Sequence, residues 1–127
     1  MSEPATTLAP NDSILNQVKV TLGLDKDYDA FDQEVMLHIN SVFFTMTQLG
    51  LGPDEGFAID GAMTPWADYI QNDKNLNVVK TYMGLRVRLL FDPPATSFGQ
   101  EAIKKQAEEL EWRMNVYAEN KKRSSQW

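Results

Sequence analysis

Hydrophobic residues recur at intervals of three and four along four stretches of the chain, which is the spacing of a buried helix face. These stretches cover residues 14–22, 30–49, 76–91 and 97–120. A short helical turn over residues 66–70 is predicted, with Thr64 as its cap and Pro65 in its first position. Strand-like alternation is weak throughout. The sequence therefore predicts an all-α fold, a small bundle of four main helices plus one short helix.

Polar caps and helix breakers set the predicted helix ends. Asp12 or Ser13 is expected to cap the first helix, because either side-chain oxygen can accept an unpaired backbone N–H. Residues 92–94 (DPP) should end the third main helix, since proline cannot continue it. Ser97 and Gln100 form a capping-box pattern for the last helix. The third main helix is apolar on two sides, which predicts that it lies at the centre of the bundle.

Three segments follow from this division of the chain. Residues 1–11 are predicted to form a flexible N-terminal arm, residues 12–119 a single helical domain, and residues 120–127 (NKKRSSQW) a basic C-terminal docking tail. The tail ends in Trp127, a residue type typical of interface anchors. A long loop over residues 50–63 (GLGPDEGFAIDGAM), between the second and third predicted elements, is suited to partner contacts.

Composition excludes several classes of protein. The chain has 127 residues, no cysteine and a net charge of −6, so disulfides and zinc–thiolate sites are excluded and a free-standing nucleic-acid binder is disfavoured. Residues 1–79 hold 3 basic and 12 acidic side chains, a balance of −9, whereas residues 80–127 hold 9 basic and 6 acidic, a balance of +3. This division predicts an electrostatic axis in the protein. Neither a signal peptide nor a membrane-spanning segment is indicated.

The sequence patterns that could indicate catalysis or cofactor binding lack residues that the chemistry requires, or contain residues that oppose it. The acidic run at residues 25–29 lacks the glycine and the final glutamate that a calcium loop requires, because Ala30 and Met36 occupy those positions. His38 is the single histidine, and no nucleophile elbow accompanies it. The glycine-rich run at residues 50–56 contains a proline and two carboxylates, which disfavour phosphate binding. No catalytic, cofactor or metal site is assigned.

Charged residues on the last two helices are interpreted as ion pairs. Arg86 and Arg88 lie among leucines and valine, so at least one should reach an acidic partner. We expect this partner on the second helix or the loop, with an interface between chains as the alternative. Carboxylates at residues 108, 109 and 111 alternate with Lys104, Lys105 and Arg113, and pairing on a solvated helix face explains them.

Several strings of residues between roughly positions 12 and 117 carry a resemblance to a known family, and the strongest is LRVRLLFDPP at residues 85–94. The others are HINSVF at 38–43, QLG at 48–50 followed by Gly52 and Pro53, Gly56 with Phe57, Trp66 with Asp68, VKTY at 79–82, Ser97 with Phe98, and ELEWR at 109–113. Together these strings resemble the head–tail connector (adaptor, or head-completion) proteins of tailed phages. They describe a fold and transfer no active site.

The resemblance implies a structural virion protein, made in the host cytoplasm and placed at the head–tail interface. Such adaptors assemble as a ring, usually twelve-fold, beneath the portal protein, extend the DNA channel without binding DNA specifically, and dock the next head-completion or tail protein. By analogy, the portal-docking residues would be Trp112, Arg113, Tyr117, Lys121, Lys122, Arg123 and Trp127. The loop facing a neighbouring subunit or the next ring would present Pro53, Asp54, Glu55, Phe57, Ile59 and Asp60.

Two other hypotheses stay open at this point. The chain could be a soluble helical adaptor or regulator of another cellular protein, without ring symmetry, since the helical pattern alone does not require a ring. An enzyme, or a metal site centred on Asp25, Asp27 and Asp29, is given little weight because the calcium-loop pattern fails. No cofactor and no membrane contact is expected.

Overall fold

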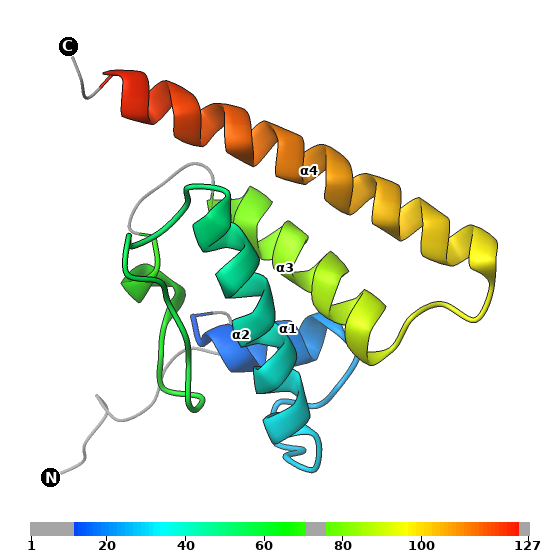
Figure 1. Ribbon diagram of the computed structural model, residues 1–127. Coiled ribbons are helices and arrows are strands. Elements are labelled where there is room, and N and C mark those ends of the chain that lie inside the picture. The colour runs from blue at the N-terminus through cyan, green and yellow to red at the C-terminus, as the bar shows by residue number, and fades with distance from the viewer. Residues whose placement is uncertain (1–11, 71–75, 125–127) are drawn as a thin grey trace, which may run out of the picture.

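The computed structural model describes residues 12–70 and 76–124, with side chains through residue 121. Its elements are α1 (Ile14–Thr21), α2 (Asp32–Gln48), the 3-10 turn η2 (Trp66–Asp68), α3 (Leu76–Phe91) and α4 (Ser97–Ser124), as Figure 1 shows. In these ranges no strand forms beyond an isolated bridge between Ser13 and Pro65. The predicted all-α fold is confirmed. The predicted arm at residues 1–11 lies outside the described residues.

Local hydrogen bonds define where the helices begin, and they correct two sequence predictions. Ser13 caps α1, because its hydroxyl accepts from the Asn16 N–H at 3.2 Å and donates to the Ala62 carbonyl at 2.6 Å. Thr96, rather than Ser97, caps α4, since its hydroxyl accepts from the N–H of residue 99 at 3.0 Å. The Gln100 side chain donates to the Pro94 carbonyl instead of closing a capping box.

The short turn η2 is three residues long and is fixed by backbone contacts rather than by a side-chain cap. No cap hydrogen bond is made at its start, so the prediction of Thr64 as cap is wrong. The Thr64 carbonyl instead accepts from Ile14 N at 3.1 Å, and Trp66 N donates to the Asp12 carbonyl at 2.8 Å. These bonds join the segment before α3 to the start of α1.

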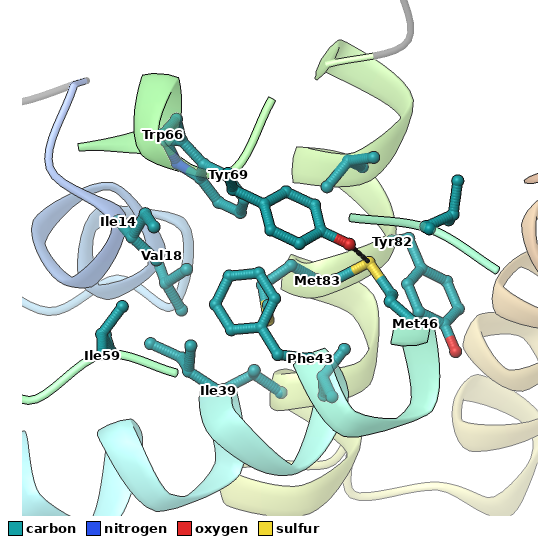
Figure 2. Close-up of a cluster of buried hydrophobic side chains, with 14 of the residues drawn as sticks. Ile14, Val18, Ile39, Phe43, Met46, Ile59, Trp66, Tyr69, Tyr82 and Met83 are labelled. Carbon is teal, nitrogen blue, oxygen red and sulfur yellow. Dashed lines mark hydrogen bonds between the residues drawn. The ribbon is translucent and has the colours of Figure 1, made fainter. Parts of the chain in front are cut away.

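The core of the bundle is built around Phe43 (Figure 2). Its ring lies 4.9 Å from that of Phe57, 6.0 Å from that of Trp66 and 4.8 Å from that of Tyr69, measured between centroids. Such tilted and edge-on pairs add to the gain from burying apolar area. The Tyr69 hydroxyl points at the sulfur of Met46, 3.7 Å away. Residues from α2, the 50–63 loop and η2 therefore form one cluster.

Helix α3 contacts each of the other three helices, which confirms its predicted central position. Helix α4 lies along α3 and is the longest element, about 42 Å at 1.5 Å per residue. The prediction that helix fades after Asn120 is wrong, because α4 continues to Ser124. The sequence contains no Gly or Pro after residue 99, and lysines near a helix C-terminus are favoured by the helix dipole.

Candidate docking surfaces

The residues predicted to dock on a portal do not share one face of α4. Trp112 is 68% exposed, whereas Tyr117 is partly buried against the core cluster. Five residues of helix turn the chain by about 140°, so these two aromatic side chains point to different sides of α4. Arg113 is exposed and pairs with Glu109 at 2.8 Å. Of the predicted set, Trp112 is the large apolar side chain that α4 leaves accessible.

The C-terminal members of that set are described only in part. The Lys121 ammonium lies over the Tyr117 ring, 5.8 Å from its centroid, which is cation–π geometry. Lys122 and Arg123 are within α4, and their side chains lie outside the described residues, as does Trp127. The first half of the predicted tail is therefore a continuation of α4.

The loop over residues 50–63 divides into an inner and an outer part. Ile59 is buried, and its backbone exchanges two hydrogen bonds with the Asn40 side chain, at 2.8 and 2.9 Å. Phe57 packs against the core cluster, and Pro53 is partly covered. The exposed members of the predicted contact set are the three acids, Asp54, Glu55 and Asp60.

Glycines set the shape of this loop. Gly50, Gly52 and Gly56 have φ values of +92°, +76° and +96°, in the left-handed region that glycine adopts without strain. At Gly52 a Cβ would lie 2.5 Å from the Tyr69 ring. A side chain at Gly52 would therefore separate the loop from the core. The loop therefore has a defined conformation that places the acidic residues Asp54 and Glu55 at the surface.

Arg86 forms an ion pair with Glu111 of α4, which ties α3 to α4. The Arg86 Nε donates to Glu111 Oε2 at 3.0 Å, and Arg86 Nη2 contacts the same oxygen. The Tyr82 hydroxyl also donates to this oxygen, at 2.6 Å. The predicted partner on the second helix or the loop is wrong, because helix periodicity identifies a buried face but not which element covers it. We call Tyr82, Arg86 and Glu111 the clasp.

The clasp shifts the protonation equilibria of its members. Burial raises the pKa of Tyr82 to about 12, and the hydrogen bond to the Glu111 carboxylate adds to the rise. Burial alone would lower the pKa of Arg86, but its hydrogen bonds to Glu111 and Tyr82 raise it overall. The arginine is therefore a permanent cation and the phenol a neutral donor near pH 7. A groove of about 370 Å³ beside the clasp is bordered by Ser41 and Thr45 of α2.

A buried lysine was missed by the sequence interpretation. Lys19 is 1% exposed, and its ammonium lies 2.8 Å from Asp32 Oδ1 and 2.9 Å from the Lys26 carbonyl. These contacts close the loop between α1 and α2. The available signal was a lone cation among the hydrophobic positions of α1, between Val18 and Val20.

Arg88 and Lys80 line a second groove, between α3 and α1. Arg88 is exposed and Lys80 partly so, and neither has an ion pair among the described residues. The groove measures about 280 Å³ and includes Gln17 and Thr21 of α1. Leu85 is the large apolar residue of its lining. The structure thus separates the two arginines, one into a pair with α4 and one into this groove.

The acidic loop at residues 25–29 and His38 make local contacts within the fold. The Asp25 carboxylate accepts from the Asp27 N–H at 2.9 Å, and Lys26 lies 3.3 Å from the Asp27 carboxylate. His38 lies 3.7 Å from Glu34 one helical turn away. Across residues 12–70 and 76–124, no three side chains of the metal-binding types gather in one place.

These features define a class: a small all-α protein whose described residues expose acids, cations without ion pairs and several large apolar side chains, all suited to contacts with other proteins. The family model described as "Phage connector protein" matches residues 14–121. The chain belongs to this phage connector family. A search of curated proteins and a search of solved structures each returned no match.

Family membership sets the broad role of the chain. The connector family is one of structural proteins, which indicates a virion component that interacts with other phage head or tail proteins. The earlier resemblance to head–tail connectors is thereby confirmed. In the part of the chain that the structure describes, no helix is long and apolar enough to cross a membrane.

Proposed function

We propose that this protein is a head–tail connector subunit that assembles as a ring, usually twelve-fold, beneath the portal. The ring extends the DNA channel and provides the docking surface for the next head-completion or tail protein. The observation that carries the proposal is the family match over residues 14–121. The subunit is made in the host cytoplasm and acts in the virion.

The structure supports an assembly role through α4. Only one side of this 28-residue helix is covered, by Ala107, Met114, Ala118 and their neighbours. Its other side leaves Trp112 68% exposed, and a large accessible aromatic residue is a typical interface anchor. Helix α4 therefore provides a long surface that the bundle does not use, and we assign portal docking to it together with the basic residues 121–127.

The charge of the chain supports passage of DNA without specific binding. A net charge of −6 repels phosphate, which favours a channel that DNA crosses without adhering. The acidic residues of the first 79 positions are proposed to face the channel or the next ring, and the basic tail to face the portal. A basic channel in an assembled ring would contradict this arrangement.

Truncation tests the docking assignment. Removing residues 120–127 deletes the last turn of α4 and the residues beyond it, while Ala118 and the core contacts of α4 remain. We expect this variant to keep its helical circular dichroism and to lose attachment to purified portal rings. Removing residues 1–11 is the control of similar size and should leave attachment unchanged.

Two results would contradict the proposal. Normal portal attachment by the chain truncated after residue 119 would show that the tail is not the docking arm. Imaging the portal complex tests the ring itself. A full-length chain that binds the portal without ring symmetry would instead favour the non-ring adaptor.

A further inference from the structure

The groove between α1 and α3 is a cationic site in an acidic protein. Lys80 and Arg88 are eight residues apart on α3, about 12 Å along the helix axis, with Leu85 between them. No carboxylate lines the groove, and neither cation has an ion pair among the described residues. Two cations without ion pairs, with an apolar side chain beside them, attract an acidic segment.

Close approach of α1 and α3 shapes this groove. Gly84 lies where the helices meet, and a Cβ there would be 2.9 Å from Thr21 Cγ2. Gly84 is buried, whereas Thr81 and Arg88 on the rim are exposed. The groove is therefore a fixed feature of the bundle with an accessible rim.

The acidic turn at residues 53–56 has the complementary charge. Asp54 and Glu55 are exposed, and the described residues supply neither of their carboxylates with a hydrogen bond or an ion pair. The turn is closed by a hydrogen bond from Gly56 N to the Pro53 carbonyl at 3.0 Å. Its position is fixed because Ile59, a few residues further on, is bound to Asn40 of α2.

The turn and the groove lie on different sides of the subunit. Glu55 and Gly56 border a hollow of about 480 Å³ that is formed against Asn40 and Phe44 of α2. Helices α1, α2 and α3 contact one another pairwise, so the outer groove between α1 and α3 faces away from α2. The two features of one chain therefore do not meet each other, but they can meet in two copies arranged head to tail.

We propose that the Lys80–Arg88 groove receives the Asp54–Glu55 turn of a second copy of this chain. The contact is heterologous, so its repetition generates a ring when the rotation closes. The inference rests on the proposed ring assembly and deepens it by assigning the two surfaces that meet. It takes the Asp54–Glu55 turn out of the acidic surface proposed to face the channel or the next ring. The acidic loop at residues 25–29 is the weaker candidate, because Asp25 and Asp27 are already engaged within their own loop.

Charge reversal in two complementary variants tests the contact. Lys80→Glu/Arg88→Glu makes both surfaces acidic, and Asp54→Lys/Glu55→Lys makes both basic. Each variant alone should self-associate at least about tenfold more weakly than the natural chain, because like charges then face each other. An equal mixture should restore association, since every contact in an alternating assembly again joins opposite charges. Sedimentation velocity at low salt measures these associations.

The matched control is Asp25→Lys/Asp27→Lys, which changes the net charge as much as the turn variant does. It should associate like the natural chain. Circular dichroism and urea unfolding check that every variant is folded, and Lys80→Gln/Arg88→Gln replaces the groove variant if reversal impairs folding. The proposal is overturned if the groove variant self-associates normally or if the mixture fails to recover self-association. It is also overturned if the control loses as much self-association as the turn variant.

A covalent test uses the absence of cysteine from the chain. The double variant Glu55→Cys/Thr81→Cys places one thiol on the turn and one on the groove rim. Under mild oxidation on portal rings it should give a ladder of linked subunits, whereas either single variant should not. A portal-bound ring without a ladder overturns the inference but leaves the proposed function intact. Absence of any ring on the portal overturns both. If Lys80→Glu/Arg88→Glu loses DNA retention while its self-association is unchanged, the groove binds phosphate rather than the acidic turn.

Discussion

The three-helix bundle α1–α3 and the long helix α4 are held in place by different kinds of contact. The bundle encloses aromatic residues that are essentially fully buried, such as Phe43 and Trp66. Helix α4 contributes the smaller buried side chains Ala107, Met114 and Ala118, and its remaining surface is largely polar. Its attachment is supplemented by a directional polar group, the clasp.

The two kinds of contact therefore have different roles, one in the stability of the bundle and one in the position of α4. Apolar burial stabilises the bundle in proportion to area and without direction. A charge-assisted hydrogen bond depends on geometry, so the clasp favours one position of α4 along α3. Loss of the clasp should therefore loosen α4 while the core of the bundle stays intact.

The largest expected effect comes from opening the bundle core. Phe43→Ala removes a ring that has no exposed surface and contacts three other aromatic rings, so it should lower the free energy of unfolding by about 3–5 kcal/mol. Phe44→Ala is the matched control. Phe44 is 65% exposed, and its loss should change stability by less than about 0.5 kcal/mol. Urea unfolding measures both, and similar values would contradict the assigned core.

The next largest effect concerns the buried cation of the bundle. Lys19→Ala leaves Asp32 partly buried without its partner, which should cost about 2–3 kcal/mol, less than a fully buried pair because Asp32 is 25% exposed. Lys26→Ala removes an exposed pair with Asp27 and should cost less than about 1 kcal/mol. The comparison uses urea midpoints at pH 7. Equal costs would mean that burial of Lys19 does not matter.

A smaller and more local effect is expected at the clasp. Glu111→Gln removes the charge that Arg86 and Tyr82 share, at a cost of about 1–2 kcal/mol. The loss should appear as faster hydrogen exchange in α4, with the amides of α2 unchanged. Glu109→Gln, in an exposed pair with Arg113, should have almost no effect. Uniformly faster exchange in both helices would show that the bundle and α4 unfold as one unit.

The sequence predicted the helices better than the contacts that each helix makes. The bounds of α3, residues 76–91, were predicted correctly, because its apolar periodicity covers this range and DPP follows it. The end of α4 was missed because residues 121–124 have no hydrophobic pattern, although nothing in them breaks a helix. The Ser97 cap was wrong because Thr96 and Ser97 are adjacent and either hydroxyl could cap the helix. The Thr64 cap was wrong because backbone bonds to the start of α1, rather than a side chain, hold the start of η2.

The candidate surfaces were predictable only as residue types. Asp54, Glu55 and Trp112 are exposed, and their role as contact residues stays a prediction. The pairing of Arg86 with Glu111 joins residues 25 positions apart on two helices, and no local spacing encodes it. The burial of Lys19 likewise depends on a loop that returns Asp32 to it. Long-range juxtaposition, rather than composition, is what the structure adds.

The smallest effect is a difference in alkaline stability between the two regions. Burial and the Glu111 carboxylate raise the pKa of Tyr82 to about 12, above its ordinary value of 10. The neutral phenol is therefore favoured in the folded protein. Its contribution to stability is fully present below pH 10 and is lost as the pH rises from 10 to about 12.

Tyr82→Phe should cost about 1 kcal/mol or less at pH 7, because Arg86 keeps its pair with Glu111. The variant should also lose less stability than the natural chain between pH 10 and 12. Urea unfolding at several pH values, with tyrosinate absorbance as the titration signal, measures this difference. Burial also raises the pKa of Tyr69, so Tyr69→Phe, in the bundle core, should likewise lose less stability than the natural chain above pH 10. If the alkaline loss disappears in Tyr69→Phe and persists in Tyr82→Phe, the core rather than the clasp sets the alkaline limit.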